Sequence, residues 1–484
     1  MVLFPRGETP TISGRWGDRT TGARASCDLQ RLAAWRSLSV NAPLSCAHLS
    51  LRPVPVLRRV SACLLLVLGS AGVGIGHAES VLIVADRLLD VRSGQYVEDP
   101  ALLVSDERVV AVGTAGSPPA NAEEARVLNL EGLTLVPGLI DMHTHIDSDP
   151  RYGGYSAYQF SDRFWSVVMV ANAARTLEAG FTTIRNLGAD EWNDVGLKQA
   201  IDEGVVPGPR IVPAAISFGA TGGHCDETYF PPSMQERNPF NADSPDEGRK
   251  RVRELRKYGA EVIKICATGG VFSRNTEPGQ QQLSLEEMQA VVTEAHRLGL
   301  RVAAHAHGAS GIRDAIRAGV DTIEHASLID DEGIALAREQ GAALSMDIYN
   351  TDYTQAEGAR NGVLEDNLRK DREIAEVQRE GFRRAHAAGV TMVYGTDAGI
   401  FPHGENARQF AVMVRYGMQP IDAIRSATLN AAVALGRDDL GSLEAGRYAD
   451  LVAVTGDPLA DVRVLESIPV VIKGGVVVKD TRGP

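Results

Sequence analysis

The sequence predicts an α/β protein: a (β/α)8 TIM barrel with a small β-sandwich domain formed from both chain ends. Two observations lead to this prediction. Eight short apolar segments alternate with helical segments in mid-chain, over the roughly 270 residues that such a barrel needs. Short strand-like segments flank this block on both sides. A doubly wound parallel sheet is the alternative interpretation of the same alternation.

The N-terminal region differs in composition from the rest of the chain. Residues 1–53 are rich in Arg, Ser, Ala and Gly and show no helical or strand periodicity, so we expect a non-native or disordered leader. Residues 54–78 have the order of a signal peptide: two arginines, an apolar run, and small residues before the cleavage site. The apolar run is short and rich in Gly for a membrane span, and a buried core helix is its alternative interpretation.

This order leads to a hypothesis about processing. We expect the true start near residues 54–57 and export to the periplasm or the medium, with no stable membrane anchor after cleavage. A native N-terminus near Glu79 would support this hypothesis, and one at Met1 would contradict it.

Residues 79–135 and 441–484 form the two parts of the predicted β-sandwich. Their short apolar segments are separated by Asp, Gly and Pro, which are typical of turns between strands. The predicted strands are 81–85, 101–104 and 108–112 in the first part, and 450–454, 470–472 and 476–478 in the second.

Residues 136–440 form the predicted catalytic barrel. One of its helices has clear limits, because Ser284 and Glu287 form a capping box and Leu298-Gly299 ends the helical pattern. The eight predicted strands are 139–142, 182–185, 210–214, 261–265, 301–305, 322–325, 343–346 and 391–395.

Charge and cysteine content argue against two classes of protein. The formal net charge of -13 does not favour binding to a nucleic-acid backbone. Of five cysteines, only Cys225 and Cys266 follow residue 78. We therefore expect two unpaired cysteines rather than a disulfide scaffold, and a fold stabilised by its core.

Residues that bind metals well stand at the ends of the predicted strands, where a (β/α)8 barrel carries its active site. Residues two apart in a strand share a face, so the pair at the end of the first strand can reach one ion. The residues are His143 and His145 on the first strand, Lys264 on the fourth, His305 and His307 on the fifth, His325 on the sixth and Asp397 on the eighth.

Lys264 lies within an apolar strand, Val262-Ile263-Lys264-Ile265. A lysine in a dry pocket loses its proton more easily, and the neutral amine can react with carbon dioxide to give a carbamate that bridges two metals. A snorkelling or ion-paired lysine is the alternative.

These motifs resemble the amidohydrolase superfamily over about residues 80–480, and most closely its Xaa-Pro and Xaa-Arg dipeptidases and ochratoxin-hydrolysing amidases. The segments that carry the resemblance are 137–145 (PGLIDMHTH), 261–265 (EVIKI) with 268–270 (TGG), 305–308 (HAHG), 323–325 (IEH) and 395–399 (GTDAG). The chain departs from the dipeptidases at Cys225, where Gly is usual, and at Arg185, where Asp is common. We interpret Arg185 as structural.

The resemblance implies a centre of two divalent metals, with zinc as the default. His143, His145 and Asp397 would hold one ion, His305 and His325 the other, and carboxylated Lys264 would bridge them. A hydroxide bridging the metals would attack the amide carbonyl, and Asp397 would pass its proton to the leaving nitrogen. The family takes its ligand from the first His of residues 305–308, which favours His305 over His307 as the ligand. His307 would then support a ligand or face the substrate.

Three residues are weaker candidates for substrate contact or packing. His224, in a glycine-rich loop, can polarise the carbonyl or bind a substrate carboxylate, and a surface-loop His is its alternative. Tyr349, past the seventh strand, is a candidate carboxylate contact. Cys266 shares a face with Lys264, and we interpret it as packing behind that lysine rather than as a nucleophile.

The predicted function is hydrolysis of a peptidyl or N-acyl amino acid, such as an Xaa-Pro dipeptide or ochratoxin A, by a homo-oligomer acting on small molecules. A cyclic-amide hydrolase or deaminase is the alternative on the same scaffold. Lys264 weighs against a deaminase, since deaminases of this superfamily usually use one metal and lack the bridging lysine. A non-enzymatic relative would have lost ligands that this chain retains.

Overall fold

A computed structural model describes residues 80–483 of this chain. The predicted leader (1–53) and signal peptide (54–78) lie outside the described residues. Within residues 80–483, no helix is both long enough and apolar enough to cross a membrane.

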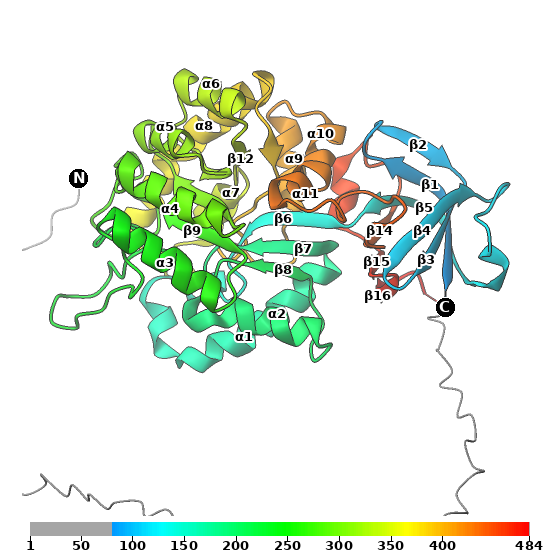
Figure 1. Ribbon diagram of the computed structural model, residues 1–484, viewed down its shortest axis with the longest axis horizontal. Coiled ribbons are helices and arrows are strands. Elements are labelled where there is room, and N and C mark those ends of the chain that lie inside the picture. Colours follow the sequence, from blue (N-terminus) through cyan, green and yellow to red (C-terminus); the bar gives the residue numbers. More distant parts are fainter. Residues whose placement is uncertain (1–79, 484) are drawn as a thin grey trace, which may run out of the picture. The chain divides into compact units, whose positions relative to one another are not determined.

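Strands from both ends of the described chain hydrogen bond into one mixed sheet, called here the terminal sheet (Figure 1). Its strand order is β16-β15-β14-β5-β1-β3-β4, with β2 paired to β1. The two chain ends meet where β14 pairs antiparallel with β5. The strands are β1 (Val81–Asp90), β2 (Gln95–Glu98), β3 (Pro100–Ser105), β4 (Arg108–Thr114), β5 (Arg126–Pro137), β14 (Leu451–Thr455), β15 (Val470–Lys473) and β16 (Val476–Asp480).

The terminal sheet encloses an apolar cluster of its own. Ile83, Leu102, Leu130, Leu451 and Ile472 come from five of its strands and are fully buried. Burial of these side chains is the main stabilising contribution that such a sheet can make. The pairing forms one continuous sheet, and a sandwich of two packed layers stays a prediction.

Eight parallel strands follow in the order predicted from the sequence. They form two sheets, β6-β7-β8 and β13-β12-β11-β10-β9. Each predicted segment contains one strand, although β13 is much shorter than expected. The strands are β6 (Leu139–Thr144), β7 (Phe181–Asn186), β8 (Arg210–Pro213), β9 (Val262–Cys266), β10 (Arg301–Ala306), β11 (Thr322–His325), β12 (Ala343–Ser345) and β13 (Met392–Val393).

Backbone hydrogen bonds connect these two sheets at both of their seams. At one seam the Phe218 N–H donates to the Lys264 carbonyl, and the Cys266 N–H donates to the Phe218 carbonyl. At the other seam the Met142 N–H donates to the Tyr394 carbonyl over 2.7 Å. The polar ends of β6 and β9 are therefore held at fixed positions by neighbouring backbone.

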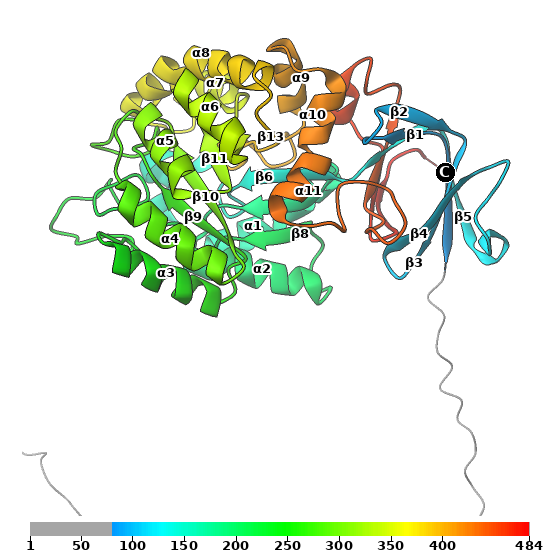
Figure 2. The same cartoon turned by 45° about the horizontal axis from the view of Figure 1, so that its top comes forward.

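Helices lie around the parallel strands (Figures 1 and 2). The predicted capping box is confirmed in α4, where the Ser284 hydroxyl accepts from the Glu287 N–H and the Glu287 carboxylate accepts from the Ser284 N–H. The α-helices are α1 (Asp162–Glu178), α2 (Asn193–Asp202), α3 (Pro245–Lys257), α4 (Leu285–Arg297), α5 (Ala309–Ala318), α6 (Asp331–Gln340), α7 (Asn350–Glu357), α8 (Glu365–Ala387), α9 (Arg408–Arg415), α10 (Pro420–Ser426) and α11 (Leu429–Leu435).

Five short 3-10 helices lie in four connections of the described chain. They are η1 (Ala122–Glu124), η2 (Pro150–Tyr152), η3 (Gly154–Gln159), η4 (Asp190–Trp192) and η5 (Val462–Glu466). Helices and strands share one large apolar core, which includes Phe181 of β7 and Phe382 of α8 and extends to Val136 of β5. This core gives the strand ends a rigid support.

Candidate metal centre

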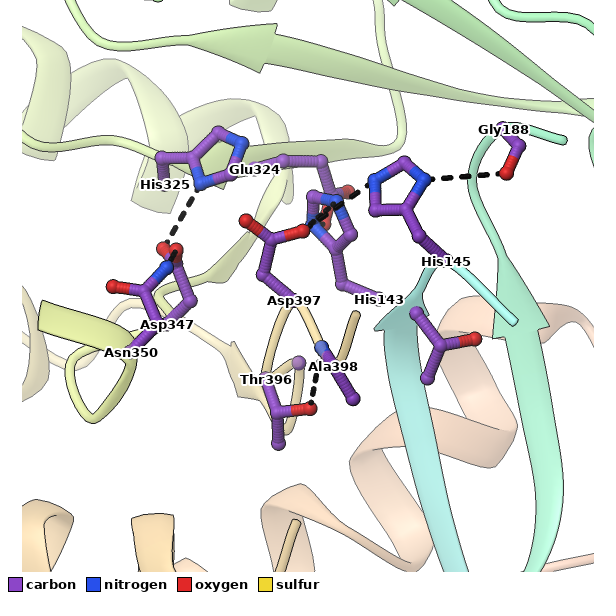
Figure 3. Close-up of polar contacts among 12 residues, drawn as sticks. His143, His145, Gly188, Glu324, His325, Asp347, Asn350, Thr396, Asp397 and Ala398 are labelled. Atoms are coloured by element: carbon purple, nitrogen blue, oxygen red, sulfur yellow. Dashed lines mark hydrogen bonds and ion pairs between the residues drawn. The ribbon is translucent and has the colours of Figure 1, made fainter. Parts of the chain in front are cut away.

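The metal-binding residue types predicted at the strand ends line one cavity of about 290 Å³. They come from four strands and the segment after β13, all at the C-terminal ends of the strands. These residues are His143, His145, Lys264, His305, His307, His325 and Asp397. The group around Asp397 is drawn in Figure 3.

His143 and His145 both present Nε2 to the same carboxylate oxygen. Asp397 Oδ1 lies 3.5 Å from Nε2 of His143 and 3.4 Å from Nε2 of His145. Their Nδ1 atoms lie 3.1 Å from a Glu324 carboxylate oxygen and 3.2 Å from the Gly188 carbonyl oxygen, respectively. An acceptor at Nδ1 fixes the ring and its tautomer, leaving Nε2 free for a metal.

Lys264 points into the same cavity and is only 3% exposed. Its Nζ lies 3.4 Å from Nε2 of His143. Burial lowers the pKa of Lys264 to about 8, although the nearby carboxylates of Glu324 and Asp397 oppose this shift. A lysine with such a pKa has an appreciable neutral fraction near pH 7, as carbamate formation requires.

A second set of ring nitrogens converges at His305, His307 and His325, whose ligand atoms lie within 4.8 Å of one another. The His305 Nε2–H donates to the Gly269 carbonyl over 3.1 Å, which leaves Nδ1 free. His307 Nδ1 bonds the Ser327 hydroxyl over 2.7 Å, which leaves Nε2 free. Both imidazoles therefore keep one nitrogen for a metal or a substrate.

The protonation state of three of these histidines suits metal binding, whereas, despite burial, Asp347 and Asp397 raise the pKa of His325. Burial holds the pKa of His143, His305 and His307 well below the usual range, so their rings are neutral. Neutral imidazoles and carboxylates are the ligands that zinc and related divalent ions require. His143, His325 and Asp397 form a further group with ligand atoms within 4.8 Å, so His and Asp residues of this cavity can hold a metal.

Two members of the group formed by His143, His325 and Asp397 have unusual backbone conformations. His325 has φ 69° and Asp397 has φ 61°, both in the left-handed region. Residues other than Gly adopt this region at an energetic cost, which active sites often bear because it aims a side chain. Here it directs both side chains into the cavity.

The residues that hold these side chains in place were not predicted from the sequence. Asp347 lies 3.0 Å from His325 Nδ1 and accepts a 2.9 Å hydrogen bond from Gln378. Glu324 faces His143 and accepts a 2.7 Å hydrogen bond from Arg185. Burial alone would raise the pKa of Glu324, but Arg185, His143 and Lys264 lower it by a larger amount. The net pKa lies below the usual range, so the carboxyl stays ionised. The one signal in the sequence was that Glu324 stands beside His325 in a strand.

The structural interpretation of Arg185 agrees with its contacts. Its side chain is 1% exposed and donates to the Met142 carbonyl, the Thr322 hydroxyl and the Glu324 carboxylate. The guanidinium thus supports the strand that carries His143 and the carboxylate that orients it.

We expect Arg185→Met to lower the free energy of unfolding by about 3–5 kcal/mol, because the Glu324 carboxylate stays buried without its main cation. Chemical denaturation of the metal-free protein measures this change. Arg163→Met is the control, since Arg163 pairs with Glu191 on the surface, where such pairs contribute about 1 kcal/mol or less. Equal losses in both variants would contradict a special role for the buried pair.

The proposed substrate contacts differ in their placement. His224 lines the cavity, and burial lowers its pKa to about 3, so its ring is neutral. Its Nδ1 bonds the Ser273 hydroxyl over 2.9 Å. Tyr349 is not among the described residues that line the cavity; its hydroxyl instead contacts Glu405 and Arg408.

The prediction of two unpaired cysteines is wrong, because Cys225 and Cys266 form a disulfide. The chain after β8 continues alongside β9, where Phe218 forms a parallel bridge with the backbone of residues 264–266. The two Cα atoms of the disulfide lie 5.8 Å apart across a sequence separation of 41. The sequence carries no local sign of this contact.

Comparison with known proteins gives consistent results. A family model described as "Amidohydrolase family" matches residues 134–478. Ochratoxinase from Aspergillus niger is 31% identical over 425 residues, covering 82% of this chain and 87% of that protein. A crystal structure of a Xaa-Pro dipeptidase with methionine bound in its active site has a TM-score of 0.77 at 34% identity, covering 82% of this chain and 99% of the other. A prolidase complexed with N-methylphosphonate-L-proline has a TM-score of 0.76 at 29% identity, covering 83% and 100%.

Proposed function

This chain belongs to the amidohydrolase family and hydrolyses amide bonds, and from that premise we propose that its substrates are peptidyl or N-acyl amino acids with a free carboxylate. Xaa-Pro dipeptides and ochratoxin A are the first candidates, because the names of two relatives of similar length indicate these substrates. The observation that carries the proposal is the convergence of His143, His145, Lys264, His325 and Asp397 in one cavity.

The proposed centre holds two divalent ions, with zinc as the expected metal. His143, His145 and Asp397 would hold one ion and His305 with His325 the other, with carboxylated Lys264 between them. The shared approach of both Nε2 atoms to Asp397 supports the first set. When bound, the ions would polarise the scissile carbonyl and lower the pKa of a water molecule.

Asp397 is the proposed proton carrier. Burial raises its pKa to about 6, although His325 and Lys264 oppose the shift. A carboxylate with a pKa near the working pH can both take up a proton and release it, which amide cleavage requires. The leaving nitrogen would receive this proton as the C–N bond breaks.

The remaining cavity wall supports a small substrate with an apolar acyl group. Leu187, Val271, Phe272, Ile374 and Ile400 supply apolar surface. Among the described lining residues there is no Arg, and Lys264 is the only Lys. The substrate carboxylate would therefore be bound by neutral donors, with His224 and His307 as the candidate side chains.

We also propose how the barrel and the terminal domain are organised. The eight parallel strands would close into a (β/α)8 barrel over residues 136–440, and the terminal sheet would fold as a sandwich from 79–135 and 441–484. Hydrogen bonds at both seams of the parallel sheets support closure. We also propose export to the periplasm or the medium through the signal peptide at 54–78, and a homo-oligomeric enzyme.

We expect the zinc-loaded protein to release the C-terminal amino acid from at least one Xaa-Pro dipeptide or N-acyl amino acid, ochratoxin A included. Chromatography of the products measures this release. The same compounds with an amidated carboxyl group are the matched controls, and we expect them to be cleaved more slowly. Release of ammonia, or opening of cyclic amides without cleavage of any acyl amino acid, would contradict the proposal and favour the alternative chemistry.

A further inference from the structure

The Cys225–Cys266 disulfide lies inside the candidate active site rather than at the surface. Both half-cystines line the cavity. Cys225 directly follows His224, and Cys266 is the last residue of β9, two positions after Lys264. The bond therefore attaches the loop that carries one proposed substrate contact to the strand that carries a proposed metal ligand.

The described backbone hydrogen bonds attach the loop that carries His224 to the strands only near its start, at Ala214 and Phe218. The segment from residue 214 to 244 contains no α-helix and no strand. Much of its bonding is internal: Asn238 donates to the Ser217 and Cys225 carbonyls, and Asp226 accepts from the Gly222 N–H. Ordering so long a segment is entropically costly, and long ordered loops in compact domains are usually functional. The disulfide is the one covalent cross-link between this segment and a strand in the described part of the chain.

The His224 ring is held closely on several sides. It stacks on His305 with centroids 4.1 Å apart. The backbone of His224 is fixed as well, since its N–H donates to the Gln282 side-chain oxygen over 2.9 Å. On another side lies Gly270, where an added Cβ would come within 2.4 Å of the ring. A small displacement of the loop would break this stacking and move Nε2 relative to the metal-binding residues.

We propose that the Cys225–Cys266 disulfide is a positioning element for catalysis, which fixes the position of the His224 ring relative to the proposed metal centre. The inference rests on the proposed function, in which His224 contacts the substrate. Opening the bond would leave the proposed metal-binding residues in place, because none of them lies in segment 214–244. It would free the part of the loop around His224, although Phe218 would still pair with β9. A misplacement of about 1 Å at a reacting group can lower turnover by up to roughly 100-fold.

A double-mutant cycle tests this inference with His224→Ala and Cys225→Ala/Cys266→Ala. We expect the cysteine replacements to lower kcat/KM by about tenfold or more when His224 is present, and by less than about twofold in the His224→Ala background. Zinc content, measured by mass spectrometry of the metal, should stay unchanged. Equal effects in both backgrounds would show that the disulfide only stabilises the fold, and would overturn the inference.

Reduction of the native holoenzyme provides a second test that does not depend on folding of the variant. Tris(2-carboxyethyl)phosphine takes the disulfide to two thiols and is itself oxidised to the phosphine oxide with oxygen from water. We expect activity to fall as peptide mapping shows opening of the Cys225–Cys266 bond, and to return on reoxidation. The same treatment of the Cys225→Ala/Cys266→Ala variant is the control and should change nothing.

The two proposals fail in different ways. If the untreated holoenzyme cleaves no acyl amino acid, the proposed function fails. If it cleaves them and full activity persists after the bond is opened, the positioning role fails while the function stands. Binding of a phosphonate analogue of an acyl-proline adds a readout without turnover, and we expect opening of the bond to weaken it.

Discussion

Lys264→Ala should abolish hydrolysis and lower the metal content of the protein. The residue lies 3.4 Å from His143 Nε2 and is buried with a lowered pKa, as a lysine that becomes a carbamate would be. Loss of an outer partner of a ligand typically costs about 10–100-fold in metal affinity or activity, so loss of a bridging ligand should exceed about 100-fold. Steady-state kinetics and metal analysis of the purified variant measure both effects.

Chemical rescue makes this prediction more specific. Short carboxylic acids such as formate should restore part of the activity of Lys264→Ala, because they can replace the carbamate carboxylate in the space that the variant opens. Lys198→Ala is the control, since Lys198 pairs with Asp202 on the surface of α2. Full activity of Lys264→Ala with an unchanged metal content would refute the bridging role.

Asp397→Asn should lower kcat by about 100-fold to 10,000-fold, the range of general acid–base contributions. The amide keeps the shape of the side chain but cannot accept a proton from water. Because Asp397 Oδ1 also lies within 3.5 Å of Nε2 of His143 and His145, the metal content should fall as well. Kinetics at saturating substrate, with metal analysis of the same sample, separate the two losses.

Asp371→Asn is the matched control for this variant. Asp371 also lines the cavity, but its carboxylate is bonded to Thr351 and Gln355 rather than to the proposed metal ligands. We expect it to change kcat by less than about threefold. Similar losses in the two variants would show that any buried acid of this cavity matters equally, and would remove the special role of Asp397.

Local patterns in the sequence were sufficient to predict the parallel strands and the metal-binding residue types. Apolar segments such as Val262-Ile263-Lys264-Ile265 identify buried strands, and a polar residue at a strand end marks the active-site face of a barrel. The spacing of His143 and His145 places both side chains on one face, which the structure confirms through their shared contact with Asp397. Each of these inferences needs only residues close together in the chain.

The residues that orient the centre were decided by tertiary structure alone. Arg185 supports Glu324, Glu324 faces His143, and Asp347 faces His325, although each pair but the last is separated by more than a hundred residues. The same holds for the Cys225–Cys266 disulfide, which joins β9 to the segment that follows β8 and lies alongside β9. A sequence shows which side chains can bind a metal, because that is a property of the residue and its strand. It does not show which distant side chains contact them. Those partners come together only when the strands assemble, because a buried charge then requires a hydrogen-bonding or charged partner.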